Sequence, residues 1–236
     1  MTIGDGVESI GGGAFSGCTS LASVEIPGSV TSIGSDAFYQ CTSLESVTIG
    51  DGVESIGERA FYQCTSLASV EIPGSVKSIE SSAFSGCENF AVTYGGTLAQ
   101  WCQMDNIDDL VYIATSIVLS GVGDLKSLKT LEIPSGVTKI VAYAFYKCVD
   151  LTSVTIPDGV ESIGEQAFDN CNSLESVTIP GSVKSIGNLA FYWCSNLKEV
   201  NYGGTEEQWK QIDIGFSAFY YNAKIYDKDG KEISRS

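Results

Sequence analysis

Hydrophobic residues recur along this chain every 23 positions, and each period opens with the same short alternation of apolar and polar side chains. In residues 18–40, Val24 and Ile26 alternate with polar neighbours. A period of two in β-branched residues predicts a short strand with one buried face. Pro27 then ends this strand, because proline offers no backbone N–H to a ladder and sets φ for a turn.

The rest of each period predicts a second extended piece and a return turn. Val30 and Ile33 belong to the second piece, and the segment from Ala37 to Cys41 turns the chain back, through a 3₁₀ or single helical turn. The anchors of the repeat are a phenylalanine and a cysteine: Phe15, Phe38, Phe61, Phe84, Phe145, Phe168 and Phe191, with Cys18, Cys41, Cys64, Cys87, Cys148, Cys171 and Cys194.

One such unit has too little core to fold alone, so successive units are expected to stack. The predicted fold is a solenoid with a parallel ladder of short strands about 4.8 Å apart, roughly eight coils long. Counting back 23 residues from Ile140 and Val154 gives Ile117 and Leu131, which predicts a degenerate coil over 117–139 with Leu125 in a cysteine place.

Two related motifs flank this second array. YGGTLAQW (94–101) and YGGTEEQW (202–209) each combine a glycine turn with a threonine three residues before a glutamine. That spacing predicts a capping box and a short helix, with the tryptophan folded onto the end of the core. Residues 224–233 predict two short strands around an Asp-Gly turn. A calcium loop was the alternative for Asp227–Glu232, although it lacks the ligands of a full site.

The predicted organisation is therefore one continuous solenoid in four parts. Residues 1–93 form the first array and 94–116 an interruption with a short helix. Residues 117–201 form the second array, and 202–236 a C-terminal cap with a short helix and a hairpin, which covers the open ladder edge. TIGDGVESIG at 2–11 recurs at 48–57, so the chain is expected to begin within a repeat.

The periodic cysteines predict packing rather than chemistry. Residues that repeat every 23 positions point the same way in each coil, so these thiols should form a buried, reduced column. Neighbouring Cβ atoms at the strand spacing would lie beyond disulfide range, and no Cys-x-x-Cys pair or histidine is present for zinc. Cys102 is off the period and is left without a role.

The motif C-T-S-L-x-S-V-x-I-P-x-S-V-x-S-I-G-x-x-A-F-x-x resembles the BspA-like leucine-rich repeats, a bacterial class with a 23-residue repeat, over about 1–93 and 117–200. The resemblance implies a β-rich leucine-rich-repeat solenoid of the α/β horseshoe type. It also implies a secreted or cell-surface location, and adhesion to host extracellular or matrix proteins or to other cells.

Charge and composition narrow the function classes. The net charge is −16, with 15 acidic and 2 basic residues in 1–125 and 14 and 11 in 126–236. Such a chain repels phosphate backbones, which argues against nucleic acid and anionic membranes. No apolar run reaches a membrane-spanning length of about 18 residues. The absence of histidine removes the commonest general base. We expect no cofactor, no metal and no catalytic residues.

Two surfaces are candidates for binding a protein partner. The strand face is the outward side of the predicted strands: Ser23, Glu25, Ser46, Thr48, Ser69, Glu71, Thr130, Glu132, Ser153, Thr155, Ser176, Thr178, Glu199 and Asn201. The tyrosine row follows each phenylalanine: Tyr39, Tyr62, Tyr146 and Tyr192, with Trp193 alongside. The strand face is otherwise an ordinary solvated surface, and the row is otherwise a set of rings packed on one another.

These observations predict a non-enzymatic protein-binding module, a surface adhesion or host-interaction region. The alternatives are an architectural spacer within a longer surface protein and, third, a carboxylate-based enzyme.

Overall fold

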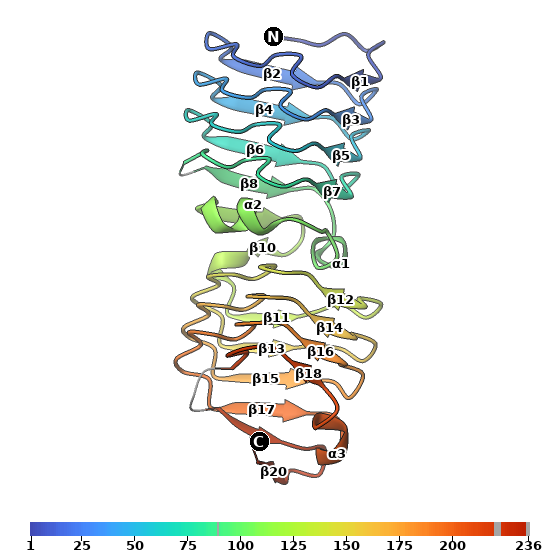
Figure 1. Ribbon diagram of the computed structural model, residues 1–236, viewed down its shortest axis with the longest axis vertical. Coiled ribbons are helices and arrows are strands. Elements are labelled where there is room, and N and C mark those ends of the chain that lie inside the picture. The colour runs from blue at the N-terminus through green and yellow to red at the C-terminus, as the bar shows by residue number, and fades with distance from the viewer. Residues whose placement is uncertain (89, 220–222, 235–236) are drawn as a thin grey trace. The chain divides into compact units, whose positions relative to one another are not determined.

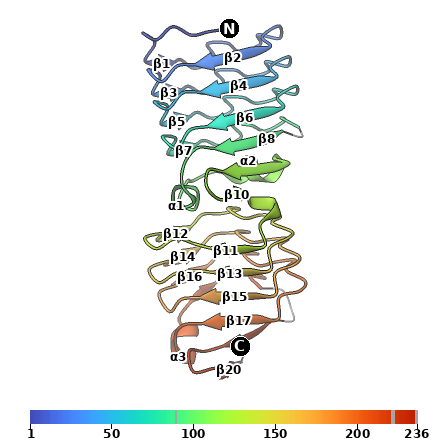
Figure 2. The same cartoon turned by 180° about the vertical axis from the view of Figure 1, so that it is seen from behind.

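The computed structural model describes residues 1–88, 90–219 and 223–234. The chain divides into two compact units. Unit 1 comprises Met1–Gln100 and Met104–Asp124, and unit 2 comprises Trp101–Gln103 and Leu125–Ser236. In each unit the strands are stacked in chain order (Figures 1 and 2). The prediction that both arrays form one continuous solenoid, divided as above, stays a prediction.

Unit 1 contains a wide and a narrow sheet whose strands are parallel except for the last strand of the wide sheet. The wide sheet consists of β2 (Ser23–Ile26), β4 (Ser46–Ile49), β6 (Ser69–Ile72), β8 (Ala91–Tyr94), β9 (Ser116–Leu119) and the antiparallel β10 (Gly123–Asp124). The narrow sheet consists of β1 (Ser9–Ile10), β3 (Ser32–Ile33), β5 (Ser55–Ile56) and β7 (Ser78–Ile79).

Unit 2 repeats this arrangement. Its wide sheet consists of β11 (Thr130–Glu132), β13 (Ser153–Thr155), β15 (Ser176–Ile179), β17 (Glu199–Tyr202), β19 (Lys224–Tyr226) and the antiparallel β20 (Glu232–Ile233). Its narrow sheet consists of β12 (Lys139–Ile140), β14 (Ser162–Ile163), β16 (Ser185–Ile186) and β18 (Asp213–Ile214). The predicted leucine-rich-repeat solenoid with parallel ladders is therefore confirmed.

Strand register follows the sequence repeat, because equivalent residues 23 apart lie side by side. Val24 pairs with Val47 in unit 1, and Val154 pairs with Val177 in unit 2. Along β2, β4 and β15 the β-branched positions are buried and the positions between them face outward, as the alternation predicted. Burial of these side chains, at about 25 cal/mol per Å² of apolar surface, is the main source of stability for the stack.

The return turn of the regular coils is not helical in the described residues, contrary to the prediction. Asp36 and Gln40 have positive φ values of 56° and 54°, which interrupt any helix. The physical reason is that alternate N–H groups are donated to the next coil, as Phe38 N–H is to the carbonyl oxygen of Ala60 at 2.7 Å. Only the groups between them close local turns, so this side of the coil forms a third hydrogen-bonded ladder.

The phenylalanines form a stacked column inside each unit. The Phe38 and Phe61 ring centroids lie 5.1 Å apart with planes 2° from parallel. In unit 2, Phe168 lies between Phe145 at 5.1 Å and Phe191 at 5.0 Å. These rings are almost fully buried, and Phe38, Phe61 and Phe168 each stack on a ring at both sides.

Six of the seven periodic cysteines are buried beside this column, as predicted, and all eight cysteines of the chain are free. Cys18 is exposed, so the prediction is wrong for this residue. It lies in the first coil, and no described coil packs on the outer side of that coil. The buried thiols also do something that the sequence did not suggest. Cys64 Sγ donates to the carbonyl oxygen of Phe38 at 3.3 Å, and the same bond recurs at Cys41, Cys87, Cys171 and Cys194. Cysteine is thus a small apolar residue with one weak donor to the preceding coil.

The interruption has a different register from the one predicted. Ile117 pairs with Val92 in the wide sheet of unit 1, whereas counting in steps of 23 placed it opposite Ile140. Residues 94–115, including α1 (Leu98–Trp101) and α2 (Asp108–Ile113), complete the coil between β8 and β9. The irregular part of the array therefore lies after β9, whereas counting placed it before Ile117. A single alternation of apolar residues fits either sheet equally well, which is why counting failed. Leu131 does pair with Val154, as counting indicated, after the short 3₁₀ helix Leu125–Ser127 in which Leu125 is buried.

Both predicted capping boxes are present. Gln208 N–H donates to Thr205 Oγ1, and the Gln208 side chain accepts from Thr205 N–H at 2.9 Å, which begins α3 (Glu206–Trp209). Thr97 and Gln100 make the same pair of bonds before α1. Trp101 is fully buried and Trp209 nearly so. The hairpin of β19 and β20 is also as predicted, with β19 pairing along the β17 edge.

Candidate partner-binding surfaces

The strand face of unit 1 consists of two straight columns of outward side chains. Ser23, Ser46 and Ser69 stand in register in one column, and Glu25, Thr48 and Glu71 in the other; all six are exposed. The structure extends both columns by residues that the sequence analysis missed: Ala91 and Ser116, and Thr93 and Val118. Ser116 and Val118 were missed because counting in steps of 23 gave residues 116–119 a different register.

In unit 2 the strand face has the same construction. Thr130, Ser153, Ser176 and Glu199 form one column, and Glu132, Thr155, Thr178 and Asn201 form the other. Ser153 and Ser176 are half-buried and the remaining six are exposed. Lys224 and Tyr226 continue the columns on β19, although the sequence assigned that strand only to the cap.

The carboxylates of the strand face are not neutralised. Among the described residues, Glu25, Glu71 and Glu132 form no ion pair, whereas Glu54 beside the narrow sheet pairs with Lys77 at 2.9 Å. Unit 1 holds 15 acidic residues and only Arg59 and Lys77 as bases. Its strand face therefore presents hydroxyl groups within a negative field, which favours a basic partner.

The structure divides the tyrosine row between the two units. In unit 1, Tyr39 and Tyr62 stack with centroids 5.3 Å apart, and the neighbouring Gln40 and Gln63 amides are hydrogen-bonded at 2.7 Å. In unit 2, Tyr146 is buried and Trp193 is 48% exposed. Tyr146 is therefore packed within unit 2 while Trp193 presents its ring to solvent, and a binding role for the row stays a prediction.

Asp169 occupies the position of this row between Tyr146 and Tyr192 and is the only charged residue that is buried in the described chain. It accepts hydrogen bonds from Gln166 Nε2 at 2.7 Å and Asn170 Nδ2 at 3.0 Å. Burial raises the pKa of the carboxyl group, and these two amides oppose that rise. The sequence analysis missed it, although its spacing of 23 residues from both tyrosines marks the position.

Among the described residues, no group of three or more histidine, cysteine, aspartate or glutamate side chains lies close enough together to hold a metal ion. Asp227 Oδ1 accepts from the N–H groups of Asp229 and Lys231 at 3.0 and 2.9 Å, so it closes the hairpin turn. Glu206 lies between Lys231 and Lys210, which lower its carboxyl pKa to about 2. These interactions stabilise the cap.

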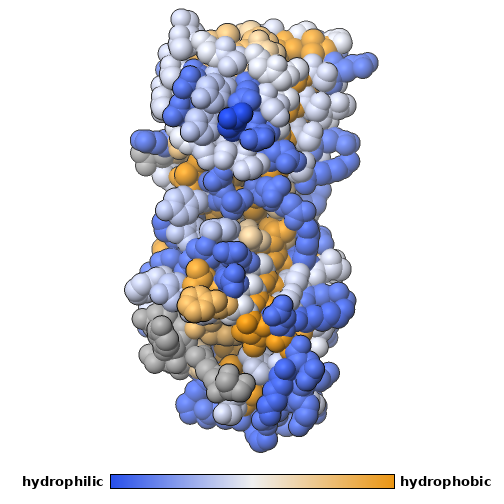
Figure 3. Space-filling view, viewed as in Figure 1, coloured by the Kyte–Doolittle hydropathy of each residue, from blue (hydrophilic) through white to orange (hydrophobic). Residues whose placement is uncertain are grey.

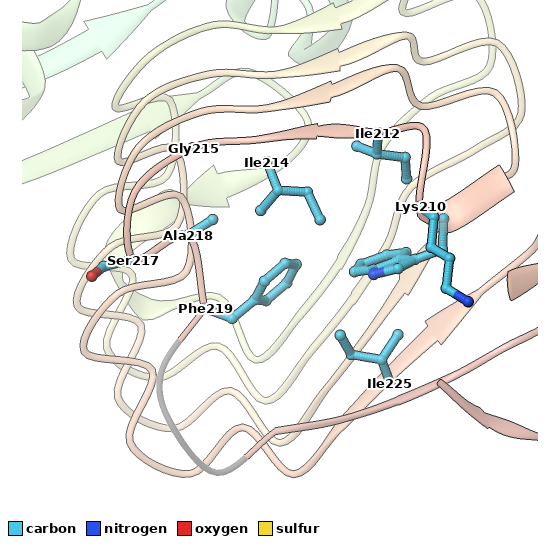
Figure 4. Close-up of a pocket in the computed structure, with 9 residues that line it drawn as sticks. Lys210, Ile212, Ile214, Gly215, Ser217, Ala218, Phe219 and Ile225 are labelled. Carbon is cyan, nitrogen blue, oxygen red and sulfur yellow. The ribbon is translucent and has the colours of Figure 1, made fainter. Parts of the chain in front are cut away.

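A hollow of about 390 Å³ opens at the C-terminal end of unit 2. Figure 4 shows Ile214, Phe219 and Ile225 directed into it, with Lys210 at its rim. Its described lining residues are apolar apart from Lys210 and Ser217. Figure 3 shows that hydrophobic residues also gather on the face of unit 2 seen in that view.

The repeats identify the family of the chain. The BspA-type leucine-rich repeat region matches in six copies, over residues 1–102 and 123–228. The chain therefore belongs to the BspA-type leucine-rich repeat family. No curated protein shows a significant match.

Solved structures of bacterial leucine-rich repeat proteins are similar to this chain. The pneumococcal vaccine antigen PcpA is 18% identical, with a TM-score of 0.46, over 88% of this chain and 68% of that one. A leucine-rich cell surface protein from Faecalibacterium prausnitzii is 26% identical, with a TM-score of 0.31, over 88% and 86%. The leucine-rich repeat protein of T. pallidum is 25% identical, with a TM-score of 0.26, over 77% and 58%. Within the described residues no helix has the length and apolarity needed to cross a membrane.

Proposed function

We propose that this chain is a non-enzymatic protein-binding module of a cell-surface or secreted protein, and that it acts in adhesion or host interaction through its strand face. The family supports a repeat-based interaction module in general. The observation that carries the proposal is the pair of exposed columns, with Glu25, Thr48 and Glu71 in register on adjacent strands.

The geometry suits an extended partner. Strands about 4.8 Å apart present a grid of side chains whose backbone is already ordered, so binding costs the solenoid little conformational entropy. The hydroxyl groups supply modest hydrogen bonds, and the unpaired glutamates attract a basic segment and accelerate its approach at low salt. The partner class is therefore a basic stretch of an extracellular or matrix protein.

The test is to immobilise the chain and measure retention of a soluble extracellular-matrix protein fraction as the salt concentration rises. Glu25→Lys, Glu71→Lys and Glu132→Lys together should reduce binding and reverse its salt dependence. The melting temperature should change little, because exposed substitutions cost within about 0.5 kcal/mol each. A matched control is Asp51→Lys, Glu80→Lys and Glu165→Lys, which changes the net charge equally at exposed turn positions.

Equal loss in the control variant would show a general charge effect and contradict the assignment to the strand face. Binding that survives the strand-face variant but is lost with Tyr39→Ser and Tyr62→Ser would move the site to the tyrosine row. A wild-type chain that retains nothing would favour the architectural spacer.

A further inference from the structure

One outward column of the wide sheet in unit 1 combines acidic, hydroxyl and apolar groups in a fixed order. It consists of Glu25, Thr48, Glu71, Thr93 and Val118 on the adjacent strands β2, β4, β6, β8 and β9, and is called the mixed column below. These strands lie one after another along the stack (Figure 2). All five side chains are exposed, and the apolar Val118 is 38% exposed. The glutamates and the valine therefore occur at every second coil, with a threonine between them.

The distance between these groups is set by the repeat of the coils. In unit 1 the Phe38 and Phe61 ring centroids are 5.1 Å apart from one coil to the next, and strands in a ladder lie about 4.8 Å apart. Glu25 and Glu71 are two coils apart, so their backbones are separated by about 10 Å. Val118 follows Glu71 after the same interval. A partner that contacts all three must present a side chain about every 10 Å.

This interval distinguishes the regular conformations of a peptide chain. In a polyproline-II helix every third residue points the same way, and three residues advance about 9.3 Å. A β-strand presents side chains to one face about every 6.6 Å, and no multiple of that distance is close to 10 Å. An α-helix returns to nearly the same face after seven residues, or about 10.5 Å. The interval therefore argues against a strand and leaves a polyproline-II segment or an α-helix.

The hydroxyl groups of the strand face distinguish these two. Thr48 and Thr93 lie between the three contact positions, and Ser23, Ser46 and Ser69 form the neighbouring column. Each hydroxyl group has one hydrogen to donate. A polyproline-II segment has no internal hydrogen bonds, so its carbonyl oxygens are open to these donors. An α-helix bonds most of its carbonyl oxygens internally and would leave the hydroxyl groups without acceptors. The hydroxyl groups therefore favour the polyproline-II segment.

We propose that the partner segment of the strand face is a polyproline-II helix that lies along the mixed column and contacts it with every third residue. Basic side chains at two successive contact positions pair with Glu25 and Glu71, and an apolar side chain at the third packs on Val118. Thr48 and Thr93 donate hydrogen bonds to backbone carbonyl oxygens of the segment between these contacts. The recognised pattern is basic-x-x-basic-x-x-apolar, in either chain direction.

This inference rests on the proposed function, because it names the partner of the same strand face. It applies to unit 1, where two carboxylates of one column are two coils apart. The corresponding column of unit 2 runs from β11 to β17 as Glu132, Thr155, Thr178 and Asn201 and has one carboxylate over these strands. We therefore expect the preference for the three-residue spacing to depend on unit 1.

Fluorescence anisotropy with labelled synthetic peptides tests the spacing. The probe is a proline-rich peptide with two arginines three residues apart and a leucine three residues further on, made in both chain directions. Two controls have the same composition with the arginines two or four residues apart, and a third is an alanine-based helix with the arginines seven residues apart. The whole chain is titrated to about 1 mM at an ionic strength of about 0.01 M, where charges are weakly screened. We expect one direction of the probe to bind about tenfold more tightly than each control.

An exchange within the mixed column moves one carboxylate and keeps the composition of the chain. Thr48→Glu with Glu71→Thr places the two carboxylates on adjacent coils, about 4.8 Å apart, an interval at which a polyproline-II helix does not repeat. The tenfold preference for the three-residue spacing should disappear, while the melting temperature stays close to that of the wild type because both positions are exposed.

The apolar contact has its own variant. Val118→Ser should weaken binding of the probe about fivefold, and should not affect a probe whose leucine is replaced by serine. The control Val149→Ser removes a valine of unit 2 that is 44% exposed and should leave both affinities unchanged.

The proposal is overturned if the probe does not bind up to about 1 mM, if it binds no more tightly than the controls, or if its preference survives the exchange of Thr48 and Glu71. Retention of matrix proteins by the Glu25→Lys, Glu71→Lys and Glu132→Lys variant is a separate readout. Retention that depends on these glutamates, without any spacing preference among the peptides, would contradict this inference and leave the proposed function standing. Retention that does not depend on them would contradict the proposed function itself.

Discussion

Unit 1 and unit 2 have cores of the same construction but differ in surface charge. Both stack phenylalanines 5.0 to 5.2 Å apart within their regular coils, and both bond a cysteine thiol to the preceding coil. Yet unit 1 has two basic residues against 15 acidic, while unit 2 has 11 against 14. Inward positions must match the coils on both sides, whereas outward positions contact mainly water and vary freely.

The residues of the tyrosine row do not vary independently of their neighbours. Unit 1 repeats a tyrosine and a glutamine in adjacent coils, which gives stacked rings and paired amides. Unit 2 places Asp169 between two tyrosines, and its burial then requires the amides of Gln166 and Asn170 as donors. A change at this position is thus accompanied by changes at its neighbours. Unit 2 also has an exposed tryptophan, Trp193, next to Tyr192.

The largest effect should come from the shared core. Phe61→Ala in unit 1 and Phe168→Ala in unit 2 each remove a ring stacked on both sides, and should each cost about 3–5 kcal/mol of unfolding free energy. Urea denaturation measures both. Phe15→Ala, which has one stacked neighbour and is half-exposed, should cost clearly less. Costs in the two units that differ by more than about 2 kcal/mol would show that the cores are not equivalent.

The buried thiols predict a loss of stability in alkali. Burial raises the pKa of Cys41 from 9.0 to about 11, so the folded chain holds this proton where the unfolded chain releases it. The protonated Cys41 thiol makes its full contribution to the free energy of unfolding below pH 9. This contribution amounts to about 3 kcal/mol and is lost as the pH rises to about 11. In unit 2, burial raises the pKa of Cys102 to about 12, so its loss should extend to higher pH.

Urea unfolding under reducing conditions, at intervals from pH 8 to about 11, measures this dependence. Cys41→Ala should flatten the decline above pH 9, and Cys18→Ala is the control, because that thiol is already exposed in the folded chain. If the unfolding free energy of the Cys41→Ala variant declines equally steeply above pH 9, groups other than Cys41 cause the decline.

The smallest effect concerns the two related motifs. Thr97→Ala in unit 1 and Thr205→Ala in unit 2 each remove a capping box and should each cost about 1 kcal/mol. Hydrogen exchange of the Gln100 and Gln208 amides reports on the two helices separately. Serine at either position keeps the acceptor and should restore protection. Protection unchanged in the alanine variants would mean that packing of the tryptophans alone holds these helices.

Much of this protein follows from periodicity. The 23-residue spacing predicted the stacking, the inward and outward alternation of each strand, the buried cysteine column and the strand face. Local chemistry predicted the capping boxes and the hairpin. These features were predictable because they depend on residues close in sequence, or on equivalent residues that must superpose when coils stack.

What the sequence determined alone is therefore the repeating unit: its strands, its turn residues, its core and its acidic surface. The tertiary structure decided what no single repeat contains. It placed Ile117 in the wide sheet of unit 1, made the cysteine thiol a donor to the preceding coil, and buried Asp169 at the row position between Tyr146 and Tyr192. It also left Cys18 in unit 1 and Phe216 in unit 2 exposed. The physical reason is that each of these outcomes depends on which coil lies next to a residue, and that neighbour is fixed only when the coils stack.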